Sequence, residues 1–186
     1  QENLMKFRTP LTLLAIAALS GCAATGSGTM TPYSQATLPT TMQVPAGHRV
    51  ALETSAAGDI TYQCRAKKDM AGQYEWVFAG PEAGLKDRSG QSVGKYYGPP
   101  ATWQSNDGSK ITGTQLALAP HGADNIPLQL VKANPAMGQG MMQGVSYIQR
   151  VNTQGGIAPQ AVCFADNVGQ NLVVSYTADY VFWRAM

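Results

Sequence analysis

The sequence predicts an all-β fold, an antiparallel β-sandwich or barrel of roughly eight to ten short strands with one disulfide. Three observations predict it. Apolar and polar residues alternate in segment after segment, which is the period of a half-buried strand. The chain contains 20 Gly and 11 Pro, and many of them stand between these segments, where turns are needed. Apart from the N-terminal leader, no stretch of more than about ten residues keeps a helical period free of Gly or Pro.

The strands are expected from residue 43 onward. Alternation is longest in 172–184, where every second residue from Leu172 to Phe182 is apolar. Gly-containing polar segments predict tight turns, because Asn, Asp and Gly tolerate a positive φ. A short helical turn is expected at 81–85. The expected strands are 49–54, 60–66, 74–78, 109–118, 126–133, 145–153 and 172–184, with turns at 67–72, 87–90 and 106–108.

The first residues predict export and lipid attachment. Lys6 and Arg8 precede an apolar run at 11–19, which is too short to cross a bilayer and fits a secretory signal. The run ends in Leu-Ser-Gly-Cys22, which resembles the lipobox of bacterial lipoproteins, where the cysteine is acylated and becomes the mature N-terminus. The alternative is an ordinary signal peptide with an unrelated cysteine.

This interpretation divides the chain into four parts. Small, uncharged residues fill the stretch after Cys22 and predict a flexible tether. The residue after Cys22 is Ala23 rather than Asp, which resembles lipoproteins sorted to the outer membrane. We therefore expect an outer-membrane lipoprotein or extracellular protein of the bacterial cell envelope, with the membrane as a partner through its N-terminal lipid. The parts are 1–4 (upstream extension or expression remnant), 5–21 (signal peptide), 22–42 (tether) and 43–186 (one β domain).

The remaining cysteines, Cys64 and Cys163, are expected to form the disulfide. Export would place them in an oxidising compartment, and two cysteines allow a single intramolecular pairing. Closing a loop of about 100 residues would stabilise the fold by about 4.7 kcal/mol in the chain-entropy model. Two buried free thiols or a metal pair are the alternatives, but no other Cys or His lies near either cysteine in the sequence.

Several strings of residues resemble a known family. They are ITYQC at 60–64, WVF at 76–78, YIQRVNTQGG at 147–156 and YTADYVF at 176–182. Together they are similar to DUF3455, a domain-of-unknown-function family found in secreted bacterial and fungal proteins, over about residues 43–184. The resemblance implies an exported protein and brings no activity, cofactor or catalytic residue with it.

Groups suited to catalysis are few. The only histidines are His48 and His121, and no Gly-x-Ser-x-Gly motif accompanies them. Asp107 and Asp179 could form the carboxylate pair of a glycosidase, but Asp107 also suits a turn and Asp179 a solvated strand face. No catalytic residue is assigned, and a secreted hydrolase that uses His121 or Asp107 is kept as an alternative.

A metal role rests on a methionine cluster. Met137, Met141 and Met142 carry thioethers, which suit Cu(I) in an exported protein. A Gly-rich loop with methionine packed at its root is the competing interpretation. No metal ligand or other cofactor is assigned, and a copper-binding protein stays as a further alternative.

Candidate binding residues come from an aromatic segment and one arginine. Trp103 could stack on a ligand or belong to the core, whereas Trp76 is expected in the core. Arg150 shares a strand face with Ile148, so it either pairs with an acidic group or loop carbonyl or contacts a ligand anion. The candidate binding residues are Tyr96, Tyr97, Trp103, Asp107, Arg150 and Thr153.

These patterns favour a binding or structural module over an enzyme. Charged residues make up 13% of the chain, the net charge is +2 and no basic cluster is present, which argues against a nucleic-acid partner. The expected partner is an unidentified protein or carbohydrate. Uncapped sheet edges would also allow self-assembly.

Overall fold

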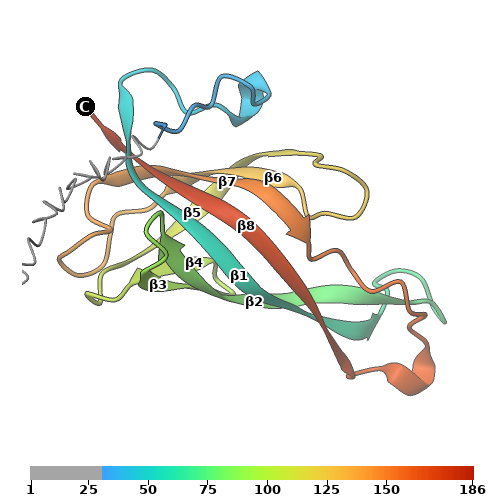
Figure 1. The fold of residues 1–186 in the computed structure, drawn as a ribbon. Helices are drawn as coiled ribbons and strands as arrows, with labels where there is room; N and C mark the ends of the chain where they lie inside the picture. Colours follow the sequence, from blue (N-terminus) through green and yellow to red (C-terminus); the bar gives the residue numbers. More distant parts are fainter. Residues whose placement is uncertain (1–30) are drawn as a thin grey trace, which may run out of the picture. The chain divides into compact units, whose positions relative to one another are not determined.

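The computed structural model describes residues 31–186. Neighbouring strands in it are antiparallel throughout. Each strand pairs with the next along the chain and β8 pairs with β1, so the sheet closes into a barrel (Figure 1). The expected all-β fold is confirmed, and it is the barrel rather than the sandwich. The strands are β1 (His48–Ala66), β2 (Tyr74–Asp87), β3 (Ser92–Tyr97), β4 (Thr102–Ser105), β5 (Lys110–Ala119), β6 (Leu128–Ala133), β7 (Val145–Gly155) and β8 (Asn171–Ala185).

Two strands, β1 and β2, are much longer than the sequence pattern predicts. β1 joins the expected strands 49–54 and 60–66, because Gly58 lets β2 approach so closely that a Cβ there would overlap the Glu82 carbonyl oxygen. The helical turn expected at 81–85 is wrong. Buried Ala83 and Leu85 alternate there with exposed neighbours, as in a strand. The expected turns are confirmed, with Gly90 and Gly108 at φ values of 83° and 88°.

The barrel interior holds the larger of two hydrophobic cores. The second core lies outside, where residues 33–47 pack on the outer face of the sheet from β5 to β8; they include the short helix η1 (Thr40–Met42). The packed unit is Tyr33–Met186 and thus begins earlier than the expected domain start at 43. The expected signal peptide and Cys22 lie outside the described residues. Among residues 31–186, no helix is long and apolar enough to cross a membrane.

Buried Gln149 fastens the N-terminal segment to the barrel. Its side-chain nitrogen donates to the Gln35 side-chain oxygen at 2.9 Å and to the Met42 carbonyl at 2.7 Å. Its side-chain oxygen accepts a hydrogen bond from the Trp183 indole at 2.9 Å. One amide therefore bonds to two buried groups and to the part-buried Gln35 side chain, and its own polar atoms are satisfied as a fully buried glutamine requires.

Alternating strand direction places the connections at two ends of the barrel. One end, which we call the disulfide end, carries the connections 67–73, 98–101, 120–127 and 156–170, including the short helix η2 (Ala165–Asn167). The expected disulfide is confirmed there, between Cys64 of β1 and Cys163 of the β7–β8 connection. The connections 88–91, 106–109 and 134–144 lie at the opposite end, where β1 begins and β8 ends.

Candidate functional site

Five aromatic side chains and one arginine converge inside the barrel. Strand alternation turns all of them inward, since side chains two apart on a strand share a face. They come from five different strands, and the aromatic members belong to the interior core. We call this set the lumen cluster: Tyr62 of β1, Tyr96 of β3, Trp103 of β4, Arg150 of β7, and Tyr176 and Tyr180 of β8.

The rings at the centre of the lumen cluster are in direct contact. Tyr96 stacks on Trp103 with ring centroids 4.8 Å apart, and the Tyr96 and Tyr180 centroids are 5.0 Å apart. Trp103 meets Tyr180 edge to face at 5.7 Å. Trp103 is 1% exposed and Tyr96 5% exposed, so both belong to the core and neither can form an outer stacking surface. The sequence left open whether Trp103 stacks on a ligand or belongs to the core, and the structure places it in the core.

Several polar atoms of the lumen cluster are buried without a hydrogen-bond partner. They are the indole nitrogen of Trp103 and the hydroxyls of Tyr176 and Tyr180. Burial raises the pKa of Tyr176 to about 12 and that of Tyr180 well above its usual value. The Tyr180 hydroxyl lies close enough to the Tyr96 and Tyr176 hydroxyls to act to lower the pKa of both. The contacts of the Tyr176 and Tyr180 hydroxyls nevertheless fall short of hydrogen-bond geometry. An unpartnered buried polar group costs about 1–3 kcal/mol, so these groups call for an explanation.

Arg150 contributes the one positive charge of the lumen cluster. Its Nε and Nη2 donate to the Pro127 carbonyl oxygen at 3.2 and 2.9 Å, which is one of the contacts that the sequence left open for it. No carboxylate of residues 31–186 forms an ion pair with it. Burial raises the pKa of Tyr96, and the nearby Arg150 charge acts in the opposite direction. The guanidinium field thus reaches into the ring cluster.

The interior is left uncovered on one side at the disulfide end. β3 and β4 form a short hairpin that pairs with β2 only over Glu82–Lys86 and with β5 only over Lys110–Thr112. Both neighbouring strands continue beyond it. Inward-facing Phe78 of β2, opposite Tyr62, is consequently 50% exposed, and Leu118 of β5 is 48% exposed.

A continuous row of residues links this open side to the arginine. Leu118 pairs with Gln129, Gln129 with Arg150, and Arg150 with Tyr180. We call the inward-facing pair Phe78 and Leu118 the apolar rim. The arrangement therefore sets an apolar rim beside a cationic, donor-rich interior.

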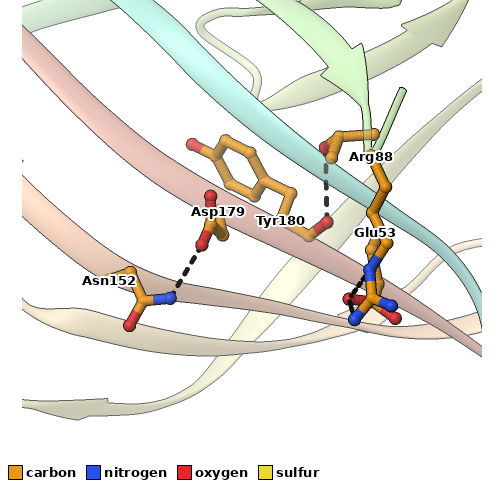
Figure 2. Close-up of polar contacts among 6 residues, drawn as sticks. Glu53, Arg88, Asn152, Asp179 and Tyr180 are labelled. Carbon is orange, nitrogen blue, oxygen red and sulfur yellow. Dashed lines mark hydrogen bonds and ion pairs between the residues drawn. The ribbon is translucent and has the colours of Figure 1, made fainter. Parts of the chain in front are cut away.

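A second candidate is a polar groove on the outer face of β7, β8, β1 and β2. Two adjoining hollows of about 650 and 510 Å³ share Ser55, Asn152 and Asp179. Figure 2 shows that polar groups here bind one another: Asn152 donates to Asp179 at 2.7 Å, and Arg88 forms an ion pair with Glu53. The groove thus meets most of its own hydrogen-bonding needs, whereas the lumen cluster does not.

Tyr33 is the exception in this groove. Its hydroxyl is buried without a hydrogen-bond partner, and burial, with the nearby Glu53 and Asp179 carboxylates, raises its pKa to about 12. The ring packs edge to face on Trp183 at 6.0 Å. This single group does not outweigh the cluster of unpartnered donors around Arg150.

Two other candidate binding residues have local structural roles. Tyr97 points outward, and its hydroxyl donates to the Gln104 side chain at 3.0 Å. Thr153 is fully buried; its hydroxyl donates to the Ile126 carbonyl at 2.6 Å and lies 3.1 Å from Nδ1 of His121. The hydrogen bonds of both side chains stabilise the barrel wall.

Asp107 forms a turn at the opposite end of the barrel. Its carboxylate accepts hydrogen bonds from the Ser109 hydroxyl and from the Met141 backbone amide at 2.7 Å, and these bonds lower its pKa to about 2. Asp107 and His121 flank the two ends of β5, a strand of 10 residues. At roughly 3.3 Å per residue they lie on the order of 30 Å apart, so they cannot act in one hydrolytic site.

The methionine loop matches the packing interpretation. Met142 is 1% exposed and belongs to the interior core, whereas Met137 and Met141 are 44% and 40% exposed. In the described part of the chain, no three side chains among His, Cys, Asp and Glu gather in a way that could hold a metal ion.

Sequence reasoning finds three members of the lumen cluster and misses three. For Tyr62, Tyr176 and Tyr180 the pattern indicates only strand residues on an apolar face. The signal that could have found them is that three tyrosines, each with a polar hydroxyl, stand at positions that alternation turns toward the core.

Comparison with known proteins gives one result. The model of a family described as a protein of unknown function, DUF3455, matches residues 45–184. No curated protein and no solved structure matches the chain.

Proposed function

Since the chain belongs to the DUF3455 family, whose description assigns no activity, we propose a function from the site itself: the barrel is a binding module for a small amphipathic anion. The carboxylate or phosphate of the ligand would bind Arg150 and the neighbouring donors, and its apolar part would lie against the apolar rim. Eight-stranded barrels have an interior of the size that either side chains or one small ligand can fill.

The unpartnered donors around Arg150 are the observation that carries this proposal. An indole N–H can only donate, a phenol donates readily, and a guanidinium carries donors and no acceptor. Trp103, Tyr176 and Tyr180 each leave such a group without a partner, and Arg150 has no acidic partner among the described residues. The group that complements such a set is an acceptor with negative charge.

The apolar rim supports an amphipathic ligand rather than a simple ion. Inward-facing Phe78 and Leu118 expose about half of their surface beside the interior. Ligand sites are characteristically apolar walls with a few well-placed polar groups. An alkyl chain on the rim would remove this apolar surface from water, at about 25 cal/mol for each Å² buried.

The proposal includes attachment to the bacterial envelope through Cys22. Support comes from the charged start, the apolar run 11–19 and the lipobox-like sequence before Cys22. Mass spectrometry of protein isolated from bacterial membranes should find Cys22 acylated at the mature N-terminus. An unmodified Cys22 would reject the anchor and leave the ligand site as it stands.

Calorimetric titration with decanoate, decyl phosphate and 1-decanol tests the ligand site. The two anions should bind, and Arg150→Gln should weaken their binding about ten- to hundredfold, because a hydrogen bond to a charged group contributes about 1.5–3 kcal/mol. The matched control is Arg49→Gln, which removes the same charge from an exposed position at the opposite end of the barrel and should leave affinity unchanged.

Three results would overturn the proposal. One is no binding of either anion to the unaltered protein. Another is equal loss of affinity in Arg150→Gln and Arg49→Gln, which would reduce the effect to net charge. The third is equally tight binding of 1-decanol, which would leave the arginine without a role in recognition.

A further inference from the structure

One edge of β2 has no strand beside it. β2 pairs with β1 from Tyr74 onward, but β3 joins its other edge only at Glu82. Figure 1 shows β1, β2 and β8 extending past the short β3–β4 hairpin. The free segment Tyr-Glu-Trp-Val-Phe-Ala at 74–79 consists mostly of good strand formers and lacks the Lys or Pro that commonly protects an edge.

Backbone hydrogen bonds near the turn between β1 and β2 show which backbone groups of β2 face away from β1. The Lys67 amide donates to the Gln73 carbonyl at 2.8 Å, so this pair is hydrogen-bonded across the hairpin. Because hydrogen-bonded and non-hydrogen-bonded pairs alternate, Glu75 and Val77 also direct their backbone groups toward β1. Cys64, which lies opposite Trp76, fits this alternation. Its amide donates to the Gln170 carbonyl and its carbonyl accepts from the Gly169 amide, so its backbone groups point away from β2.

Tyr74, Trp76 and Phe78 therefore point their backbone N–H and C=O groups away from the barrel. Within residues 31–186, no backbone partner meets these three residues on that edge. The three lie at spacing two, which is the pattern that an antiparallel strand needs in order to pair with a copy of itself.

We propose that two copies of the protein associate by antiparallel pairing of their free β2 edges, centred on Trp76. In this register Trp76 faces Trp76 of the second copy, and Tyr74 faces its Phe78. Aromatic pairs opposite each other on a sheet are favourable, by about 0.2–1 kcal/mol each. The symmetric contact closes on itself and forms a dimer.

The opposite face of the paired strands allows the register to be tested with charge. Glu75 of one copy stands opposite Val77 of the other, with Arg65 on the far side of Glu75 and Gln63 on the far side of Val77. The row across the dimer is therefore Arg65, Glu75, Val77, Gln63. A negative charge at position 77 would be repelled by Glu75 of the second copy. A positive charge there would form a favourable ion pair with it.

Sedimentation velocity on Val77→Glu and the matched Val77→Lys tests this register. The unaltered protein and Val77→Lys should dimerise, and Val77→Glu should be monomeric, or have a dissociation constant raised at least tenfold. Circular dichroism should show equal strand content in both variants. A monomeric unaltered protein overturns the proposal, and so does equal loss or equal retention of the dimer in the two variants.

A cross-link gives a second, independent measurement. Glu75→Cys and Val77→Cys proteins, mixed and mildly oxidised, should form a mixed disulfide dimer, because directly opposed non-hydrogen-bonded residues have Cα atoms about 4.5 Å apart. Either variant alone should cross-link poorly. Efficient cross-linking within either variant alone would refute the register. Neither experiment depends on ligand binding at Arg150, because Val77 and Glu75 face away from the interior.

Discussion

Replacing Tyr180 by Phe should make the protein more stable. The Tyr180 side chain is fully buried and its hydroxyl has no hydrogen-bond partner, so folding removes the hydroxyl from water without compensation. Such a group costs about 1–3 kcal/mol, and the substitution removes that cost. The space left behind is small, since at about 24 cal/mol for each Å³ a lost oxygen of roughly 10 Å³ costs about 0.2 kcal/mol. The free energy of unfolding should therefore rise by about 1–2.5 kcal/mol.

Tyr62 provides the matched control for this substitution. Its hydroxyl donates to the Gly156 carbonyl oxygen at 2.8 Å, so Tyr62→Phe removes a hydrogen bond and leaves a buried carbonyl without its donor. The free energy of unfolding should fall by about 1 kcal/mol or more. The two substitutions remove the same atom from the same residue type inside the same barrel, and they should change stability in opposite directions.

Urea denaturation followed by circular dichroism measures both effects, provided that the slope with denaturant is unchanged between variants. A loss of stability in Tyr180→Phe comparable to that in Tyr62→Phe would mean that the Tyr180 hydroxyl has a partner in solution, such as Tyr176 or ordered water. That result would refute the claim of unpartnered donors in the lumen cluster and remove the main support for an anion site.

Three further predictions concern pH, the N-terminal segment and the disulfide. Burial holds the pKa of Tyr176 at about 12, so stability should be fully present below pH 10 and fall between pH 10 and 12 as the unfolded state loses its proton; urea midpoints that stay constant from pH 9 to 11.5 would contradict this. Gln149→Leu should lower the free energy of unfolding by about 2–3 kcal/mol, because it leaves the Trp183 indole and the Met42 carbonyl unbonded, and limited proteolysis should then cut within 33–47 faster than in the unaltered protein. Replacing both Cys64 and Cys163 by Ala should cost up to about 4.7 kcal/mol, and an unchanged urea midpoint would show that the cross-link does not constrain the unfolded chain.

The sequence predicts the strands well where alternation is regular and poorly where small residues interrupt it. Residues 55–59 carry no alternating apolar pattern, yet they lie in the middle of β1 because Gly58 permits a close approach to β2. The strands β3 and β4 escape prediction for a different reason. Each is short, and the Gly and Pro residues of their hairpin look like a loop when the partners on both sides are unknown.

The candidate site shows a similar limit. Alternation tells which side chains share a face, but the face that points inward depends on how the sheet closes. Arg150 shares its face with Ile148, and this correctly indicates a guanidinium directed toward apolar surroundings. Its neighbours Tyr62 and Tyr96 lie more than fifty positions earlier in the sequence and are brought to it only by the barrel. Contacts between residues so far apart in the sequence have no local signal.

The short β3–β4 hairpin connects the proposed ligand site with the proposed dimer. Because β3 and β4 end early, inward-facing Phe78 and Leu118 are exposed, and for the same reason the edge of β2 from Tyr74 onward has no partner. A hairpin extended by about six residues on each strand, to reach Trp76 of β2 and Leu118 of β5, would cover both features at once. Such a variant should lose self-association and decanoate binding together, whereas Val77→Glu should lose only the first and Arg150→Gln only the second. If the three variants behave in this way, the short hairpin is the common structural cause of two separate sites. If they do not, the gap in the sheet has no such role.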